Sequence, residues 1–178
     1  MNAHILIAGF GGQGILCAGK VLAYEGLVEG RQLSWLPSYG PEMRGGTCNC
    51  NVILSDDPVG SPIVSKPDIL MVMNLPSLDK YEDTVVPGGW IFLDSTLIER
   101  EVRRTDVNVV RVPATELAGK IGLPTLANMV MLGKIIERTG VVNFDELDEA
   151  LHHVVSAKRP QLMDMNKLAL KTGYEYEG

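Results

Sequence analysis

Short apolar runs and helical patterns alternate along the first part of the chain. Residues 5–8 are all apolar, which is typical of a buried strand, and Gly9 follows them. From residue 15 to residue 29 apolar side chains recur at helical spacing, and Gly30 suits the end of a helix. A second strand is predicted over residues 32–36. The chain therefore opens as strand, glycine-rich turn, helix and strand.

A different pattern spans residues 47–55, where side chains alternate between the two faces of one predicted strand. One face is made by Cys48, Cys50, Val52 and Leu54, and the other by Asn49, Asn51, Ile53 and Ser55. The second, more polar face predicts a half-buried strand. Residues 37–46 hold two prolines and three glycines, so we expect a structured loop there, with an antiparallel strand interrupting the parallel order.

The rest of the chain predicts further strands and then mostly helices. Strands are expected at residues 68–73, 90–93 and 107–112, and helices at residues 76–83, 114–121, 126–138, 144–154 and 161–171. Residues 173–178 are expected to form a loose tail. Strands separated by helices favour a Rossmann-like α/β fold. We expect a mostly parallel sheet flanked by helices, a helical C-terminal part, and a single domain over residues 1–178.

Several candidate residues follow directly after predicted strands. The carboxyl ends of parallel strands meet at one edge of the sheet, and ligands bind there in folds of this kind. Residues 9–14, 37–46, Asn74, 94–96 and Pro113 are expected to share that edge. Asn74 and the sequence Asp94-Ser95-Thr96 have two open interpretations, namely binding a ligand or capping the next helix.

The first turn carries the spacing Gly9-x-Gly11-x-x-Gly14, and its candidate binding residues are Gly9, Gly11, Gly12, Gln13 and Gly14. Glycines let a backbone approach a pyrophosphate, and a helix amino end offers free N–H groups. NAD or FAD would also need an acidic residue at the end of the second strand to hold a ribose. Residues 33–36 contain none, which disfavours a dinucleotide. A tight turn, a site for another phosphate and contact with a partner's backbone stay open.

The charge and hydropathy of the chain disfavour nucleic acid and membrane as partners. The formal net charge is −6 at pH 7, and an acidic chain repels phosphate backbones. No apolar run approaches the roughly 20 residues that span a bilayer. The first residues lack the features of a signal peptide, so we expect a cytoplasmic protein.

Catalytic and metal-binding motifs are not found in the sequence. There is neither a Gly-x-Ser-x-Gly elbow nor a P-loop, so no catalytic residue is assigned. The three cysteines cannot supply the four thiolates of a [4Fe–4S] cluster, and Cys48 and Cys50 are expected to pack in the core. His152 and His153 are expected at the surface. Residues 128–136 are apolar around most of a helix, which must be buried in the fold or against another chain.

The most specific segment of the chain is Ser38-Tyr39-Gly40-Pro41-Glu42-Met43-Arg44-Gly45-Gly46. Its candidate binding residues are Ser38, Tyr39, Gly40, Glu42, Arg44, Gly45 and Gly46. Arg44 offers a planar fork suited to a carboxylate or phosphate, and the glycines let another surface approach. We favour an interface with other subunits, followed by contact with a bound anion. A rigid turn, in which Glu42 and Arg44 pair with neighbours, is the third interpretation.

With the glycine-rich turn, this segment resembles the gamma subunit of the pyruvate, 2-oxoisovalerate and 2-oxoglutarate ferredoxin oxidoreductases. That family combines a Gly-x-Gly-Gly-Gln-Gly opening with a Ser-Tyr-Gly-Pro-Glu-x-Arg-Gly-Gly loop, and both stand here at 9–14 and 38–46. The resemblance continues through residues 73–80, 87–89 and 128–133. It looks closest to the branch that acts on 2-oxoglutarate or branched-chain 2-oxoacids.

The resemblance implies a role in oxidative decarboxylation of a 2-oxoacid to an acyl-coenzyme A, with reduction of ferredoxin. Enzymes of the family use thiamine diphosphate, iron–sulfur clusters and coenzyme A, and they hold the first two on other chains or domains. The chain would be an assembly subunit, incomplete as a catalyst, with a coenzyme A contact as a hypothesis. The expected partners are alpha and beta subunits, with a ferredoxin-like delta subunit as a further candidate. A stand-alone dinucleotide-binding oxidoreductase and a self-associating scaffold are the alternatives.

Overall fold

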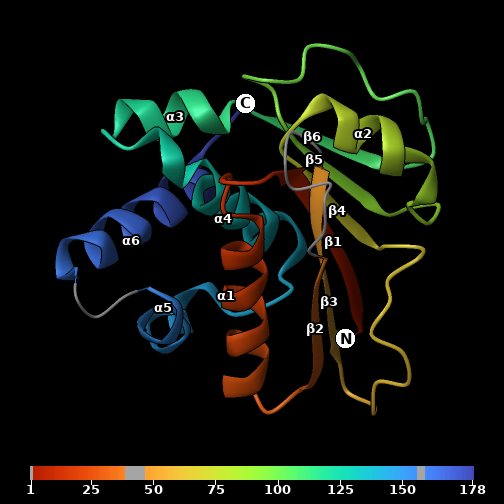
Figure 1. The fold of residues 1–178 in the computed structure, drawn as a ribbon, viewed down its shortest axis with the longest axis horizontal. Helices are drawn as coiled ribbons and strands as arrows, with labels where there is room; N and C mark the ends of the chain where they lie inside the picture. Colours follow the sequence, from red (N-terminus) through yellow and green to blue (C-terminus); the bar gives the residue numbers. More distant parts are fainter. Residues whose placement is uncertain (1, 39–46, 156–158) are drawn as a thin grey trace.

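The computed structural model describes residues 2–38, 47–155 and 159–178, and it places six strands in one sheet (Figure 1). The order across the sheet is β2-β3-β1-β4-β5-β6. The strands are β1 (Ala3–Phe10), β2 (Gln32–Ser38), β3 (Thr47–Ser55), β4 (Ile69–Val72), β5 (Trp90–Asp94) and β6 (Asn108–Val112). β3 runs antiparallel to both neighbours, whereas β1, β4, β5 and β6 are parallel. The Rossmann-like, mostly parallel sheet with one antiparallel insertion is thereby confirmed.

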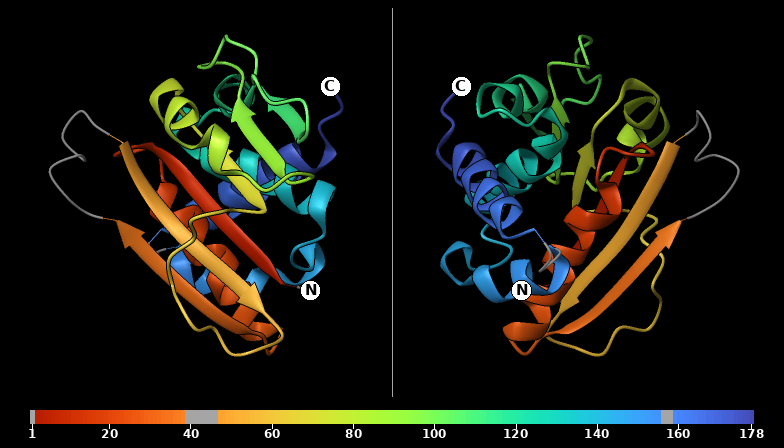
Figure 2. Two further views of the ribbon diagram at one scale, coloured as in Figure 1. Left: turned by 90° about the vertical axis from the view of Figure 1, so that its right-hand side faces the viewer. Right: turned by 60° about the vertical axis from the view of Figure 1, so that its left-hand side comes forward.

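Helices cover the two faces of the sheet unequally, as Figure 2 shows. The helices are α1 (Ile15–Val28), α2 (Leu75–Tyr81), α3 (Ala114–Lys120), α4 (Ala127–Thr139), α5 (Asp148–Val154) and α6 (Pro160–Glu175), with short 3-10 turns at Glu82–Thr84, Pro124–Leu126 and Phe144–Glu146. α1 and α4 pack on one face, and α5 and α6 lie outside them. α2 and the segment between β3 and β4 cover the other face. The chain therefore buries apolar side chains on both sides of the sheet.

The alternation along β3 is confirmed, but the expectation of a half-buried strand is wrong. Cys50 faces the larger core under α1 and α4, and Ile53 faces the smaller core under α2. Asn51, on the same face as Ile53, is also buried, and its side-chain oxygen accepts a hydrogen bond of 2.9 Å from the backbone N–H of Val64. The segment after β3 folds back over this face, so a polar residue is buried because its amide is satisfied there.

The expectation of a loose tail from residue 173 is also wrong. α6 continues to Glu175, and the ring of Tyr174 stacks on Phe144 at 4.0 Å between centroids. Gly173 lies against the backbone of α4, where a Cβ atom would stand 1.7 Å from the carbonyl oxygen of Val130. The absence of a side chain at Gly173 is what lets the two helices approach, so this glycine is a packing residue rather than part of a loose chain end.

Two smaller differences concern element boundaries. β2 extends through Pro37 to Ser38, which a strand at the edge of a sheet tolerates because a proline there lacks only one ladder donor. The single helix expected over residues 144–154 is a 3-10 turn followed by α5. Among the described residues, no helix is both long and apolar enough to cross a membrane.

Candidate functional site

The carboxyl ends of the parallel strands form one edge of the sheet, as expected. Asn49 on β3 is the register partner of Ser38 on β2 and of Ala8 on β1. Val72 on β4 pairs with Ala8, and Leu93 on β5 pairs with Val72. Ser38 and the turns that follow β1, β4 and β5 therefore stand side by side at this edge, which we call the carboxyl rim.

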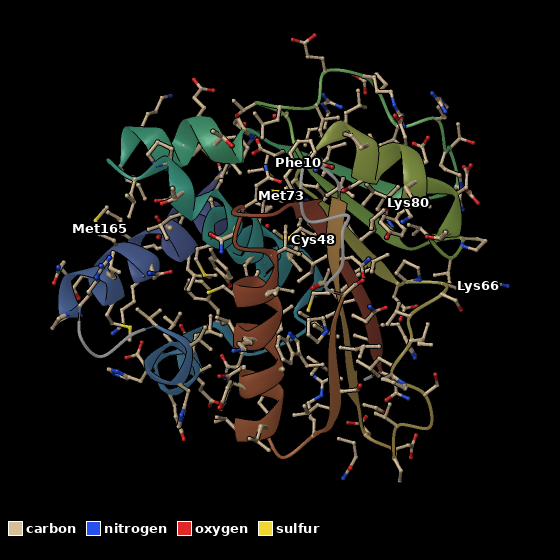
Figure 3. All side chains as sticks on the ribbon, in the orientation of Figure 1. Phe10, Cys48, Lys66, Met73, Lys80 and Met165 are labelled. Atoms are coloured by element: carbon tan, nitrogen blue, oxygen red, sulfur yellow. The ribbon has the colours of Figure 1, made fainter. Side chains whose placement is uncertain are left out.

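Gln13 holds the glycine-rich turn in place at the rim. Its side-chain oxygen accepts a hydrogen bond of 2.6 Å from the N–H of Phe10, and its side-chain nitrogen donates one of 3.0 Å to the carbonyl of Met73. Figure 3 labels Phe10 and Met73 at this edge. A Cβ atom on Gly9 would stand 2.6 Å from the Gln13 oxygen, so a glycine is needed where this side chain crosses the turn. One amide group thus joins the ends of β1 and β4.

Two glycines of the turn adopt backbone angles that other residues rarely take. Gly14 has φ +72°, and a Cβ atom there would stand 2.3 Å from the side-chain nitrogen of Asn128. That nitrogen donates a hydrogen bond of 3.0 Å to the Gly14 carbonyl. Gly12 has φ +89° but opens onto free space, and both Gly11 and Gly12 are exposed. The turn is therefore held on its inner side by the Asn128 amide, while the backbone on its outer side is accessible.

The amino end of α1 is available to a negatively charged group. Gly14 caps the helix without a side-chain hydrogen bond, and the first turn carries no acidic residue. The N–H groups of such a helix start are unpaired within the helix and carry partial positive charge. This end of α1 could therefore bind a phosphate or carboxylate approaching over the exposed glycines.

Buried polar atoms without a hydrogen-bond partner also lie in the residues that frame the rim. They are the side-chain nitrogen of Asn74, the hydroxyl of Ser77 and the side-chain oxygen of Asn128. Asn74 nevertheless caps α2, because its side-chain oxygen accepts a hydrogen bond of 2.9 Å from the N–H of Ser77. Helix capping is therefore confirmed for Asn74. Ser77 was not singled out from the sequence, although an asparagine three residues before a serine and just before Leu-Pro is a helix-start signal.

Asp94 follows the same logic of helix capping. Its carboxylate is fully buried and accepts hydrogen bonds from the N–H of Thr115, in the first turn of α3, at 3.4 Å, from the hydroxyl of Thr115 at 2.5 Å and from the N–H of Thr96 at 3.1 Å. Both carboxylate oxygens are engaged, so Asp94 joins β5 to the start of α3. The capping interpretation of this residue is the one that the contacts support.

Apolar side chains are exposed along the rim. Phe10 follows β1, Leu75 follows β4 and Leu97 follows β5, and each is more than one third exposed. The turns after β1, β4 and β5 therefore each present an apolar side chain at this edge of the sheet. A surface of this kind is suited to contact with another protein chain.

The cysteines and histidines form no site of their own in the part of the chain that the structure describes. Cys48 and Cys50 are buried, and burial raises the pKa of the Cys50 thiol to about 12. Core packing is therefore confirmed for both, and no group of three His, Cys, Asp or Glu side chains there could hold a metal ion. His152 and His153 are exposed, and the ring of His153 stacks on Tyr24 with centroids 4.8 Å apart.

Most of the second predicted site segment cannot be placed. Tyr39, Gly40, Glu42, Arg44, Gly45 and Gly46 lie outside the described residues, and only Ser38 of that segment is described. Ser38 is the last residue of β2 and lines a pocket of about 440 Å³ together with Asn49 and Tyr81. In that pocket the side-chain nitrogen of Asn49 donates a hydrogen bond of 3.1 Å to the Tyr81 hydroxyl.

The position of β3 argues further against a dinucleotide. In dinucleotide-binding folds the second strand lies beside the first and carries the acidic residue that holds the ribose. Here β3 separates β2 from β1, which moves the end of β2 by one further strand spacing, about 5 Å. No acidic residue occurs from Gln32 to Ser38. The alternative of a stand-alone dinucleotide-binding oxidoreductase therefore has no geometric support.

The chain is similar to a known protein family and to several of its members. Residues 4–176 match the family model described as pyruvate ferredoxin/flavodoxin oxidoreductase. Ketoisovalerate oxidoreductase subunit VorA of Methanothermobacter thermautotrophicus is 44% identical over 98% of this chain, and this chain spans only 36% of that protein. The keto/oxoacid ferredoxin oxidoreductase gamma subunit of Geobacter sulfurreducens is 29% identical with a TM-score of 0.85, covering 98% of this chain and 95% of its own.

A third relative shares the fold at lower identity. The 2-oxoglutarate:ferredoxin oxidoreductase of Magnetococcus marinus, solved with 2-oxoglutarate, coenzyme A and succinyl-CoA bound, has a TM-score of 0.85 at 22% identity. The match covers 97% of this chain and 30% of that one. The same unit therefore occurs both as a separate subunit and as about a third of a longer polypeptide. The resemblance noted from the two glycine-containing motifs is confirmed, and the chain belongs to the pyruvate ferredoxin/flavodoxin oxidoreductase family, as a gamma-type member.

Proposed function

We propose that this chain is the gamma subunit of a thiamine-diphosphate-dependent 2-oxoacid:ferredoxin oxidoreductase. The observation that carries the proposal is the family match over residues 4–176, which includes the glycine-rich turn at the rim. The complex would convert a 2-oxoacid to an acyl-coenzyme A and carbon dioxide and pass electrons to ferredoxin. The relatives act on ketoisovalerate or 2-oxoglutarate by their names, so a branched-chain 2-oxoacid or 2-oxoglutarate is the proposed substrate.

The chain's own contribution is assembly. The described residues offer no cluster suited to a metal, and Asn74 and Asp94 at the rim cap helices. Phe10, Leu75 and Leu97 provide an apolar border to which alpha and beta subunits can dock. In this proposal the thiamine diphosphate and the iron–sulfur clusters are carried by those partners, as they are in the family that the sequence resembles.

A contact with coenzyme A is the second part of the proposal. Its pyrophosphate is doubly charged, and the amino end of α1 presents N–H groups with no acidic residue in the first turn. Gly12 leaves open space in front of these groups. A protein of the same fold was solved with coenzyme A bound, which supports the same class of ligand here.

The first test is native purification of the chain from its source under exclusion of oxygen. Copurification of thiamine-binding and iron–sulfur subunits, with 2-oxoacid-dependent reduction of a dye, is the expected result. Assay with 2-oxoglutarate, 2-oxoisovalerate and pyruvate then selects the substrate. A chain that purifies alone with a bound nucleotide would contradict the proposal and favour the dinucleotide-binding alternative.

The coenzyme A contact is tested with two variants that differ only in charge. Asn and Asp both tolerate a left-handed backbone better than other side chains, so Gly12→Asn and Gly12→Asp strain the turn equally. In the assembled enzyme, Gly12→Asp should raise the coenzyme A concentration needed for half-maximal rate, whereas Gly12→Asn should change it less. The thiamine diphosphate requirement should stay the same in both. Equal coenzyme A requirements in the two variants would remove this part of the proposal.

A further inference from the structure

An apolar groove lies on the side of the molecule away from α2. Its volume is about 420 Å³, and it lies between α1, β2 and α5. The lining residues are Lys20, Ala23, Tyr24, Leu27, Leu33, Trp35, His153 and Val154. Leu27 is 60% exposed at its border, so the apolar surface continues out of the groove. No part of the function proposed above uses this surface.

The strand that forms one wall of the groove has a free edge. β2 stands at the end of the sheet order and pairs with β3 only, within the ranges that the structure describes. Figure 2 shows it at the outer side of the sheet. None of its residues is fully buried, and Gln32–Ser38 contains no charged side chain. Alternate peptide groups of such an edge point outward and can pair with another strand.

The opposite edge of the sheet is protected in a way that β2 is not. β6 carries Arg111, whose guanidinium donates hydrogen bonds to the carbonyls of Ile98 at 2.7 Å and of Arg100 at 3.0 Å. A charged side chain tied to a neighbouring loop discourages pairing along an edge strand. On β2 the corresponding protection is limited to Pro37 near its end, which leaves Gln32–Leu36 available.

Lys20 sets the charge that an occupant of the groove should carry. Its ammonium nitrogen lies 5.2 Å from the centroid of the Trp35 ring. Among the described residues no carboxylate lies within ion-pair distance of Lys20, although the chain is acidic overall. An extended segment pairing with β2 would place an acidic side chain opposite this cation and an apolar side chain over Leu33 and Trp35.

We propose that the edge of β2 and the adjoining groove bind an extended segment of a partner subunit of the same enzyme, which adds a seventh strand to the sheet. This inference rests on the proposed function for the existence of that partner. The long relatives support such an origin, because the unit equivalent to this chain makes up only 36% or 30% of their polypeptides and is covalently joined to the remainder. Pairing with the free peptide groups of β2 requires the partner segment to be extended, and the charge of Lys20 calls for an acidic residue within that segment.

Hydrogen exchange of β2 tests the inference directly. The amide protons of residues 32–36 that do not pair with β3 should exchange at least about tenfold more slowly in the assembled enzyme than in the isolated chain. The amide protons of β6 should show no comparable change. An assembled, active enzyme in which β2 exchanges as fast as in the isolated chain would overturn this inference and leave the proposed function intact. Failure to assemble at all would instead remove the proposed function, and this inference with it.

A pair of variants adds an independent readout. Leu27→Glu introduces a charge beside the groove, and Leu168→Glu introduces the same charge at a 43% exposed leucine on α6. Both isolated chains should unfold at the temperature of the unmodified chain, because both side chains are exposed. Leu27→Glu should weaken retention of partner subunits by about tenfold, and Leu168→Glu should not. Equal retention in both overturns the inference. Protection of β2 that instead appears in the isolated chain as its concentration rises identifies a second copy as the occupant and also overturns it.

Discussion

Asn128, at the start of α4, donates a hydrogen bond of 3.0 Å to the carbonyl oxygen of Gly14, at the start of α1. The two residues are 114 positions apart in the sequence, and Asn128 is buried. The contact fixes the glycine-rich turn to the helical layer on the same face of the sheet. It also explains why Gly14 must be a glycine, since any Cβ atom would meet this amide.

Removing the Asn128 amide should therefore destabilise the fold. Asn128→Ala loses the bond to the Gly14 carbonyl, which keeps its bond of 3.1 Å from the N–H of Ala18, so the variant should lose about 0.5–1.5 kcal/mol. Asn128→Asp should be at least as harmful, because a buried carboxylate cannot donate to that carbonyl at neutral pH. Chemical unfolding of the two variants measures both effects. An Asp variant as stable as the unmodified chain would show that this bond does not hold the turn.

The contact between α4 and α6 depends on glycine. A Cβ atom at Gly173 would stand 1.7 Å from the Val130 carbonyl oxygen, and one at Gly133 would stand 2.0 Å from the Leu170 carbonyl oxygen. Gly173→Ala should lower the free energy of unfolding by more than about 2 kcal/mol, because two helix backbones must move apart.

The matched control is Gly119→Ala, on α3. There the nearest atom to a new Cβ lies 3.8 Å away, on the side chain of Pro124. This variant should be neutral or more stable by up to about 1 kcal/mol, because alanine favours a helix interior over glycine. Thermal unfolding of both variants compares them, and similar losses in the two would contradict a special role for Gly173.

Neither alanine nor glutamate should be able to replace Gln13. Gln13→Ala loses the bonds to Phe10 and Met73, which together are worth about 1–2 kcal/mol. Gln13→Glu keeps the acceptor for the Phe10 N–H but turns a carboxylate oxygen toward the Met73 carbonyl, so it should be no more stable than the alanine variant. Hydrogen exchange at residues 10–13 should rise in both. A glutamate variant that restores full protection would show that the bond to Met73 is dispensable.

The layered fold can be predicted from the sequence because each strand has a recognisable pattern of apolar residues within its own segment. Residues 5–8 and 47–55 show their periodicities within a single strand, so both are predicted, although β1 runs two residues further at each end. The order of strands requires knowledge of β3, whose position between β2 and β1 depends on pairing between distant segments. The burial of Asn51 is likewise hidden from the sequence, since it depends on the N–H of Val64 reaching its side chain.

The candidate site, too, is only partly predictable from the sequence. Gly9 to Gly14 can be found from spacing alone, because a turn of this kind needs glycines at fixed positions. The partners that hold it cannot, since Asn128 and Met73 meet the turn only in three dimensions. The same is true of the groove beside β2, which combines side chains from three elements.

Glu25, on α1, predicts a pH dependence of stability. Its side chain is fully buried, and both carboxylate oxygens lack a hydrogen-bond partner. Burial raises its pKa from 4.5 to about 7, and the nearby carboxylates of Glu29, Glu146 and Glu149 act in the same direction. The folded chain therefore binds a proton more tightly at this position than the unfolded chain does.

The sign of the effect follows from that difference. Below pH 4.5 Glu25 is protonated in both states and carries no penalty, whereas between pH 4.5 and 7 the unfolded chain loses its proton first and folding becomes less favourable. Well above pH 7 the penalty is complete, at about 3 kcal/mol. Glu25→Gln should thus raise the free energy of unfolding at pH 8 by this amount and change it little at pH 4.5. Glu116→Gln, on α3, is the control, because that side chain is 57% exposed and is not one of the carboxylates that raise the Glu25 pKa. Urea unfolding at the two pH values separates the cases, and a gain in stability from Glu25→Gln that is equal at both would show that the charge on Glu25 is not what destabilises the fold.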